Sequence, residues 1–202
     1  MSIPELWREL QDFWFGELSA GYPREPRDTL WFGGGAALDA DIRRRFGDAV
    51  DAAIDGAFAD WEGDARGELA LVLLLDQLPR NIHRGSARAF AGDERARRIV
   101  DAALAAGRDR ELAPIERAFF YLPLEHSEQR ADLERCVALF EQLLAEAPPE
   151  QRAAAASRLD YAVRHRAVIE RFGRYPYRNA VLGRPSTDQE LSWLEQGERF
   201  GQ

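Results

Sequence analysis

The chain has 202 residues, which is enough for one domain of ordinary size. Hydrophobic residues make up 46% of the sequence and charged residues 31%, a balance that predicts a packed core and excludes a disordered chain. The formal net charge is −8, so the overall charge does not favour binding to nucleic acid or to anionic lipid.

The basic and sulfur-containing residues restrict the chemistry further. All 27 Lys and Arg positions are arginine, which excludes Schiff-base chemistry on a lysine side chain. Cys136 is the only cysteine, so no intrachain disulfide can form, and its place in an apolar stripe predicts a core residue. The N-terminus lacks a signal-peptide pattern, and the longest apolar run, Leu69–Leu75, is too short to cross a bilayer. These features predict a cytoplasmic protein.

Helix signals begin at the N-terminus. Ser2–Glu5 has the pattern of a capping box that opens a first helix. A long irregular stretch follows from Gly16 to Ala37, and its two large aromatic residues, Trp31 and Phe32, predict that it is pinned to the body of the protein. Asp39 is then predicted to cap the next helix.

The middle of the chain contains the most apolar segment. Leu69–Leu75 is apolar on every side of a helix, which predicts a central helix that is packed all round. Pro79 removes a helical N–H group, so we expect this helix to end near Leu78. Gly107 is predicted to end the helix after it.

The last part of the chain has equally clear boundaries. Pro148-Pro149 separates the helix that carries Cys136 from a long helix over about residues 151–172, with Gly173 as its stop. Thr187–Glu190 forms a second capping box and opens the last helix. We therefore predict an all-α fold, a single domain over residues 1–202 with about eight to ten helices in antiparallel hairpins.

Several segments of the chain have the composition and order of a known family. They are Asp12–Gly16, Trp31-Phe32, Leu75–Asn81, Arg84-Gly85, Phe119–Glu128 and Arg171–Asn179. Over nearly its whole length the chain thus resembles the bacterial domain-of-unknown-function family nine-two-four. The resemblance implies an all-helical fold like a tetratricopeptide-repeat superhelix and implies no assigned activity. His83 stands where an aromatic residue is common in that family and Tyr177 where a histidine is common, which argues against an essential imidazole at either position.

The first candidate segment runs from Asp76 to Asn81, with Arg84 after it. In one interpretation it is a rigid platform that aims Asp76, Arg80 and Asn81 into a cleft. In the other, Asp76, Gln77 and Asn81 satisfy backbone groups at the helix break and Arg80 pairs with a carboxylate.

The second candidate segment contains Glu125, His126 and Ser127. Adjacent residues cannot share one face of a helix, so Glu125 and His126 do not form a helical metal-binding pair. His126 is a candidate general base that a carboxylate would orient. The alternative is that Ser127 caps the next helix and His126 is a buried histidine whose hydrogen bonds are satisfied.

The third candidate segment lies between Asp160 and Arg184. Three of its arginines share a face at helical spacing beside a histidine, and two more polar residues follow a break at Pro176. Such a group of guanidinium groups suits an anion site, although it also suits an exposed, salt-bridged face. The residues are Arg164, His165, Arg171, Arg174, Arg178 and Asn179.

These segments lead to one preferred function and two alternatives. The preferred hypothesis is a pocket for a small anionic ligand or an acidic peptide end, formed where the three segments converge. The first alternative is a hydrolase-type enzyme with His126 or His165 as base and Asp76 or Glu125 as the orienting carboxylate. The second is a protein-interaction module like those of the tetratricopeptide-repeat class.

Few further ligands are expected. The three histidines are not spaced four residues apart, so we expect no metal site, and no sequence pattern predicts a cofactor, nucleic acid or a membrane as partner. The oligomeric state stays open.

Overall fold

The computed structural model of the chain describes residues 3–196. These residues divide into two compact units, one formed by the chain up to residue 83 and residues 88–123, the other by residues 84–87 and the chain from residue 124 onward. Each unit is described by itself. The single domain over residues 1–202 stays a prediction.

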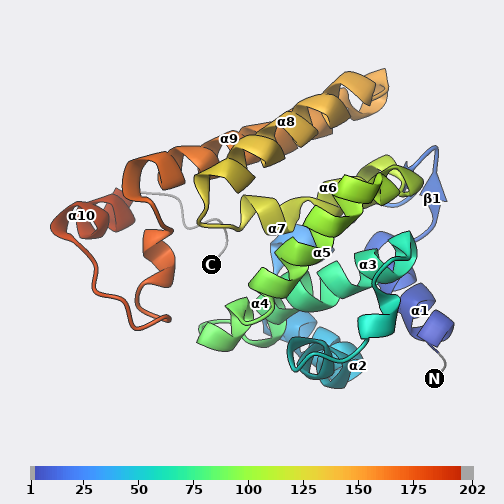
Figure 1. The fold of residues 1–202 in the computed structure, drawn as a ribbon, viewed down its shortest axis with the longest axis horizontal. Helices are drawn as coiled ribbons and strands as arrows, with labels where there is room; N and C mark the ends of the chain where they lie inside the picture. Colours follow the sequence, from blue (N-terminus) through green and yellow to red (C-terminus); the bar gives the residue numbers. More distant parts are fainter. Residues whose placement is uncertain (1–2, 197–202) are drawn as a thin grey trace. The chain divides into compact units, whose positions relative to one another are not determined.

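Almost all regular structure is helical (Figure 1). Within residues 3–196 there are ten α-helical segments, eight of them with seven or more residues, which confirms the predicted all-α class. In chain order they are α1 (Ile3–Phe15), α2 (Ala36–Ile54), α3 (Ala65–Val72), α4 (Leu78–Ile82), α5 (Asp93–Ala106), α6 (Pro114–Phe120), α7 (Leu122–Glu125), α8 (Arg130–Glu146), α9 (Arg152–Phe172) and α10 (Asp188–Gln196). Two short strands, β1 (Leu18–Ser19) and β2 (Tyr22–Pro23), pair antiparallel after α1. None of the helices in residues 3–196 is both long enough and apolar enough to cross a membrane.

The predicted central helix is the core of the first unit. Every residue of Leu69–Leu75 has an exposed fraction of 0%, which confirms that this segment is packed on all sides. Burying one such leucine side chain contributes roughly 1.5–3 kcal/mol to stability.

The predicted end of this helix at Leu78 is wrong. The chain continues from α3 through a π-helical turn, Leu73–Gln77, directly into α4. In that turn the Leu78 N–H donates to the Leu73 carbonyl, so the helical register changes just before Pro79. Pro79 then occupies the first turn of α4, where a missing N–H group breaks no helical hydrogen bond. The chain therefore stays helical through Pro79, in a hydrogen-bond register that differs from that of α3.

Of the predicted helix caps at the N-terminal ends, one is confirmed and one is wrong. At α10 the Thr187 N–H donates to the Glu190 carboxylate at 2.7 Å and the Glu190 N–H donates to the Thr187 hydroxyl at 3.2 Å, which is a capping box. Asp39 does not cap α2, because that helix already begins at Ala36. The capping box predicted at Ser2–Glu5 lies outside the residues whose side chains are described, although α1 itself is present.

The predicted helix stops are confirmed. Gly107 follows α5 and Gly173 follows α9, and both have the left-handed backbone conformation that favours glycine at a helix end.

Of the neighbouring residues Trp31 and Phe32 in the long stretch after α1, only Trp31 packs against the body of the protein. The Trp31 indole N–H donates to the Trp14 carbonyl at 3.0 Å, and its ring lies 4.7 Å from the Phe119 ring. Phe32 is 68% exposed, so its predicted role in pinning the loop is wrong. The segment also ends earlier than predicted, since α2 begins at Ala36.

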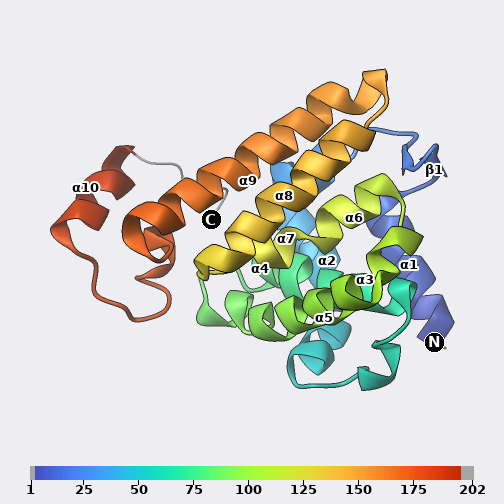
Figure 2. The ribbon, with the colours of Figure 1, turned by 45° about the horizontal axis from the view of Figure 1, so that its top comes forward.

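In the second unit α8 and α9 lie side by side as an antiparallel pair (Figure 2). The turn between them contains Pro148 and Pro149, as predicted. Cys136 of α8 is fully buried, which confirms its interpretation as a core residue, and burial raises the pKa of its thiol. Leu133, Ile169 and Tyr175 belong to one buried cluster of this unit.

Candidate functional site

The first candidate segment forms an internal ion-pair network. Both terminal nitrogens of Arg80 donate to the Asp93 carboxylate, at 3.1 and 3.2 Å, and Arg80 also lies 3.2 Å from the carboxylate of the fully buried Asp76. Gln77 donates to Asp76, and Asn81 donates to Asp39 at 2.8 Å. These contacts favour the interpretation in which the polar residues satisfy one another beside the π-helical turn.

The second and third candidate segments meet in the second unit. The Tyr175 hydroxyl donates to the Glu125 carbonyl, and the Arg178 Nη1 donates to the His126 carbonyl at 3.0 Å. The Arg178 guanidinium carbon lies 4.6 Å from the centre of the Tyr175 ring. The turn after α9 is therefore bonded directly to the turn after α7.

His165 of α9 lies at the centre of this junction and is 3% exposed. Its Nδ1 is 2.9 Å from the Tyr161 carbonyl oxygen and 3.4 Å from the Glu125 Oε1. Because both neighbours are hydrogen-bond acceptors, Nδ1 carries the proton of the neutral ring. The His126 ring lies 6.2 Å from the His165 ring, and the Tyr175 ring lies 5.7 Å from it.

Burial and neighbouring positive charge act on His165 in the same direction. Burial first, and then the charges of His126, Arg178 and Arg164, lower the pKa of His165 from 6.5 to about 3. The imidazole is therefore neutral at physiological pH, and three other basic side chains lie within electrostatic reach of it. This basic cluster contrasts with the net charge of −8 of the chain.

The low pKa also bears on catalysis by His165. A general base works best with a pKa near the operating pH, and its nitrogens must reach a substrate. A buried imidazole with a pKa of about 3 meets neither condition, so the geometry disfavours His165 as the base of a hydrolase.

Ser127 supports the start of α8. Its hydroxyl donates to the Asp132 carboxylate at 2.7 Å and accepts from the Gln129 N–H at 3.0 Å. Gln129, not Ser127, is the residue that immediately precedes α8. The hydroxyl thus stabilises the start of the helix although Ser127 lies two residues before Gln129. This is close to the capping role that the sequence predicts.

Glu128 and Arg184 form a pair that the sequence analysis did not single out. Arg184 donates to the Glu128 carboxylate through two nitrogens, at 2.7 and 3.0 Å, and the Tyr175 N–H donates to the same carboxylate at 2.8 Å. Burial opposes ionisation of Glu128, but the hydrogen bonds from Arg184 and Tyr175 outweigh it and lower the pKa of Glu128. Both residues adjoin candidate motifs, which is the signal that could have identified them.

The predicted shared face of Arg164, Arg171 and Arg174 is wrong at Arg174. The helix ends at Phe172, and Gly173 turns the chain away, so Arg174 leaves the face of α9. Arg174 donates to the Glu190 carboxylate at 2.7 and 2.8 Å and thereby joins the turn to α10.

Asn179 and Arg171 also have contacts within the unit. Asn179 donates to the Ser186 hydroxyl at 3.0 Å and accepts from Arg184 at 3.0 Å. The guanidinium carbon of Arg171, an exposed residue, lies 4.8 Å from the centre of the Phe172 ring. Arg84 is exposed in the short segment 84–87.

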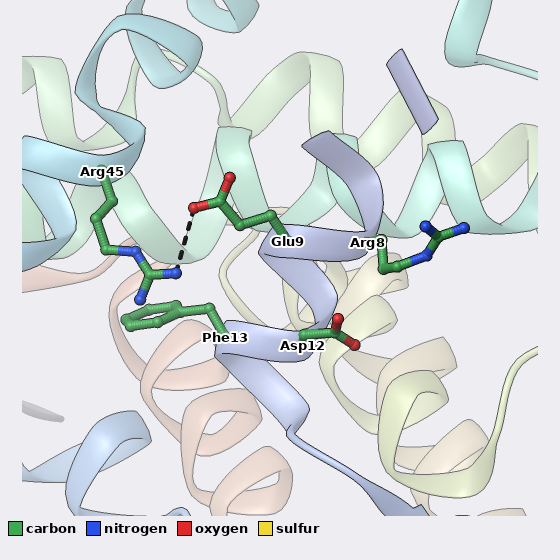
Figure 3. A pocket seen from close by; sticks show the side chains of 5 residues that line it. All are labelled: Arg8, Glu9, Asp12, Phe13 and Arg45. Atoms are coloured by element: carbon green, nitrogen blue, oxygen red, sulfur yellow. Dashed lines mark hydrogen bonds and ion pairs between the residues drawn. The ribbon is translucent and has the colours of Figure 1, made fainter. Parts of the chain in front are cut away.

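The first unit has a hollow of about 500 Å³ that contains none of the predicted site residues. It lies at α1 and α2, where Arg45 stacks 4.3 Å from the centre of the Phe13 ring and its Nη2 lies 3.3 Å from the Glu9 carboxylate (Figure 3). Arg8 and Asp12 line the rest of it. Two cations and two anions leave the hollow without a dominant charge, so it does not select an ion of either sign. Across residues 3–196 there is also no group of three or more His, Cys, Asp or Glu side chains placed to hold a metal ion.

The fold and the basic cluster define an all-α protein with a buried histidine close to several basic side chains. By comparison with known families, residues 10–198 match the family described as bacterial protein of unknown function (DUF924). The chain belongs to this family, as its motifs predict.

A solved structure is similar over nearly the whole chain. It is the protein of unknown function ATU0120 from Agrobacterium tumefaciens, which has 36% sequence identity and a TM-score of 0.81. The match covers 97% of this chain and 100% of the other. No curated protein matches significantly.

Proposed function

We propose that the protein binds a small anionic ligand, or the acidic end of a peptide, at the basic cluster of the second unit formed by His126, Arg164 and Arg178. The observation that carries the proposal is that the His126 ring lies 6.2 Å from the buried His165 ring and that the positive charges of Arg164 and Arg178 also act on it, in a chain with a net charge of −8. Arg164 already holds a carboxylate in an exposed ion pair with Asp160, so the cluster offers a soluble anion the same guanidinium chemistry.

The three basic residues contribute at different depths. Arg178 is 5% exposed and adds its charge from beneath, while its bond to the His126 carbonyl holds the two turns together. The Arg164 side chain is 33% exposed, and His126 is half-buried, so both reach solvent. The ligand would therefore contact Arg164 and His126 directly, and Arg178 would strengthen the local positive potential.

This site is smaller than the set of residues predicted from the sequence. Arg80 and Arg174 each bind a carboxylate through two nitrogens, which supports a role in holding elements together. The neighbours of Arg80 have the same role. Asp76 pairs with Arg80, Gln77 donates to Asp76, and Asn81 donates to Asp39.

A second candidate function is a protein-interaction module with superhelical packing of the tetratricopeptide-repeat kind. The observation that favours it is that Asp76 is buried and paired with Arg80. This segment therefore serves internal packing and is not available to a small ligand, so a partner protein would bind to another surface. Phe32, at 68% exposed, offers an aromatic contact for a partner.

A thermal-shift screen of the purified chain tests the first proposal. The panel contains inorganic phosphate, citrate, phosphorylated and carboxylated metabolites, and a peptide with an acidic C-terminus. A ligand at 100 times its Kd stabilises the folded protein by roughly 2.7 kcal/mol, or about 5–10 °C for a chain of this size. We expect Arg164→Ala to remove the shift.

Arg166→Ala is the matched control. Arg166 lies on the same helix, its side chain is equally 33% exposed, and like Arg164 it pairs with a carboxylate four residues away in sequence. The control should retain the shift. Equal losses in both variants would refute the site, and a panel without any shift would favour the interaction module.

A further inference from the structure

Tyr161 is a large side chain that stays exposed beside the basic cluster. It is 45% exposed, whereas most of the aromatic residues of the second unit are buried or partly buried. The Arg164 guanidinium packs over the ring, and nearly half of the residue remains accessible to a ligand.

The helical spacing of α9 places Tyr161 next to the proposed anion site. Arg164 and His165 follow Tyr161 by three and four residues, so each lies about one turn of the helix away from Tyr161. The Arg164 guanidinium carbon is 4.1 Å from the centre of the Tyr161 ring, and the Tyr161 carbonyl accepts the His165 Nδ1–H at 2.9 Å. The Tyr161 ring and the Arg164 guanidinium are thus in contact where both residues are partly exposed, and the buried His165 is bonded to the Tyr161 backbone.

The present partner of Arg164 is weakly held. Its Nε lies 2.9 Å from the Asp160 carboxylate, but the Asp160 side chain is 65% exposed. Exposed ion pairs four residues apart on a helix contribute little to stability, so a ligand anion can replace Asp160 at small cost. Arg164 would keep its place over the Tyr161 ring during that exchange.

We infer that the ligand of this site is a small planar aromatic acid, with its anionic group on Arg164 and His126 and its ring packed against Tyr161. This inference rests on the proposed function and specifies its ligand. An aromatic ring gains stacking energy on tyrosine beyond that of an equally large saturated ring, and a guanidinium can bind an anion while it remains stacked.

Two carboxylic acids of nearly equal size and equal charge test the inference. Benzoate is planar and aromatic, and cyclohexanecarboxylate is neither. We expect benzoate to bind roughly three- to tenfold more tightly in an NMR titration of the full chain, the ratio that aromatic pairing predicts. Tyr161→Leu keeps an apolar side chain without the ring, so this variant should bind both acids equally.

The controls separate this inference from the proposed function. Arg164→Ala should weaken both acids, and Arg166→Ala should weaken neither. If both acids bind equally to the wild-type chain and Arg164→Ala weakens both, the aromatic preference is refuted while the anion site stands. If neither acid nor inorganic phosphate binds, the proposed function and the inference fail together. Melting curves of all variants check that each is folded.

Discussion

His165 is the residue whose surroundings have the clearest energetic consequence. Its ring is enclosed by Glu125, Tyr175 and the backbone of Tyr161, so protonation would place a charge where water does not reach it. Burial also raises the pKa of Tyr175, which keeps that phenol neutral and able to donate to the Glu125 carbonyl. The buried part of the site is therefore built for neutral His165 and neutral Tyr175.

The stability of the protein should depend on pH through His165. The folded-state pKa of about 3 lies below the ordinary value of 6.5, so on unfolding the ring takes up a proton at any pH between these values. The stabilisation is complete above pH 6.5 and is lost as the pH falls, at about 1.4 kcal/mol per pH unit for this one residue. Chemical denaturation between pH 6.5 and 4.5 should show this slope, and His165→Asn should reduce it by that amount.

Other groups with shifted pKa values have to be considered in that experiment, among them His83 and Glu190. Burial lowers the pKa of His83, so this residue also makes stability fall as the pH falls. Its contribution to the slope remains in the His165→Asn variant. The hydrogen bond from Arg174 lowers the pKa of Glu190 from 4.5 to about 2, so its contribution is present above pH 4.5 and is lost only at lower pH. An unchanged slope in His165→Asn would contradict a neutral, buried imidazole.

Among the elements, the π-helical turn between α3 and α4 combines an irregular backbone with nearly complete burial. It contains Leu73, Leu75 and Asp76, all fully buried. Gly92 packs against its backbone, because a Cβ at that position would lie 2.9 Å from the Leu75 Cα and well inside contact distance of the Leu75 carbonyl oxygen. The glycine is therefore required by the close approach of two backbone segments.

We predict that Gly92→Ala destabilises the protein by about 1–3 kcal/mol or more, because the added methyl group must displace backbone atoms of the core. Gly47→Ala is the matched control. Gly47 lies inside α2, and a Cβ there would meet its first neighbour at 3.6 Å, an ordinary contact. That change should instead stabilise the protein by up to about 1 kcal/mol through helix propensity. Urea denaturation of both variants measures the difference, and equal effects would argue against the close packing at Leu75.

For the molecule as a whole, stability depends chiefly on the apolar residues that each unit buries. In the first unit these surround Leu69–Leu75, and in the second they lie between α8, α9 and the turn after α9. The ion pairs add specific connections, since Arg174–Glu190 and Arg184–Glu128 each join the turn after α9 to another element of the second unit.

Truncation in the core should be far more costly than truncation at the surface. Leu73→Ala removes fully buried methyl groups and should cost about 2–5 kcal/mol. Leu191→Ala, at a residue that is 51% exposed, should change stability by less than about 0.5 kcal/mol. Calorimetric melting curves should show a fall of at least about 4 °C for the first variant and little change for the second. Similar melting temperatures would contradict the central role of this segment.

The helical class, the leucine-rich core helix and most helix ends are determined by the sequence itself. These features depend on residues within a few positions of one another: an apolar run, a glycine after α5 or α9, and the Thr187–Glu190 box. Where local patterns failed, a more distant group had changed the outcome. Asp39 binds Asn81 instead of capping α2, and Pro79 follows a change of register within the core.

Only the tertiary structure decides which charged groups meet. Arg178 reaches the His126 carbonyl across 52 residues, and Arg184 reaches Glu128 across 56 residues. With 27 arginines and 35 acidic residues, the sequence permits far too many pairings to choose among them by spacing. The arginines that hold the fold together and those that surround His165 are chemically identical, and only their positions in space distinguish Arg174 from Arg164.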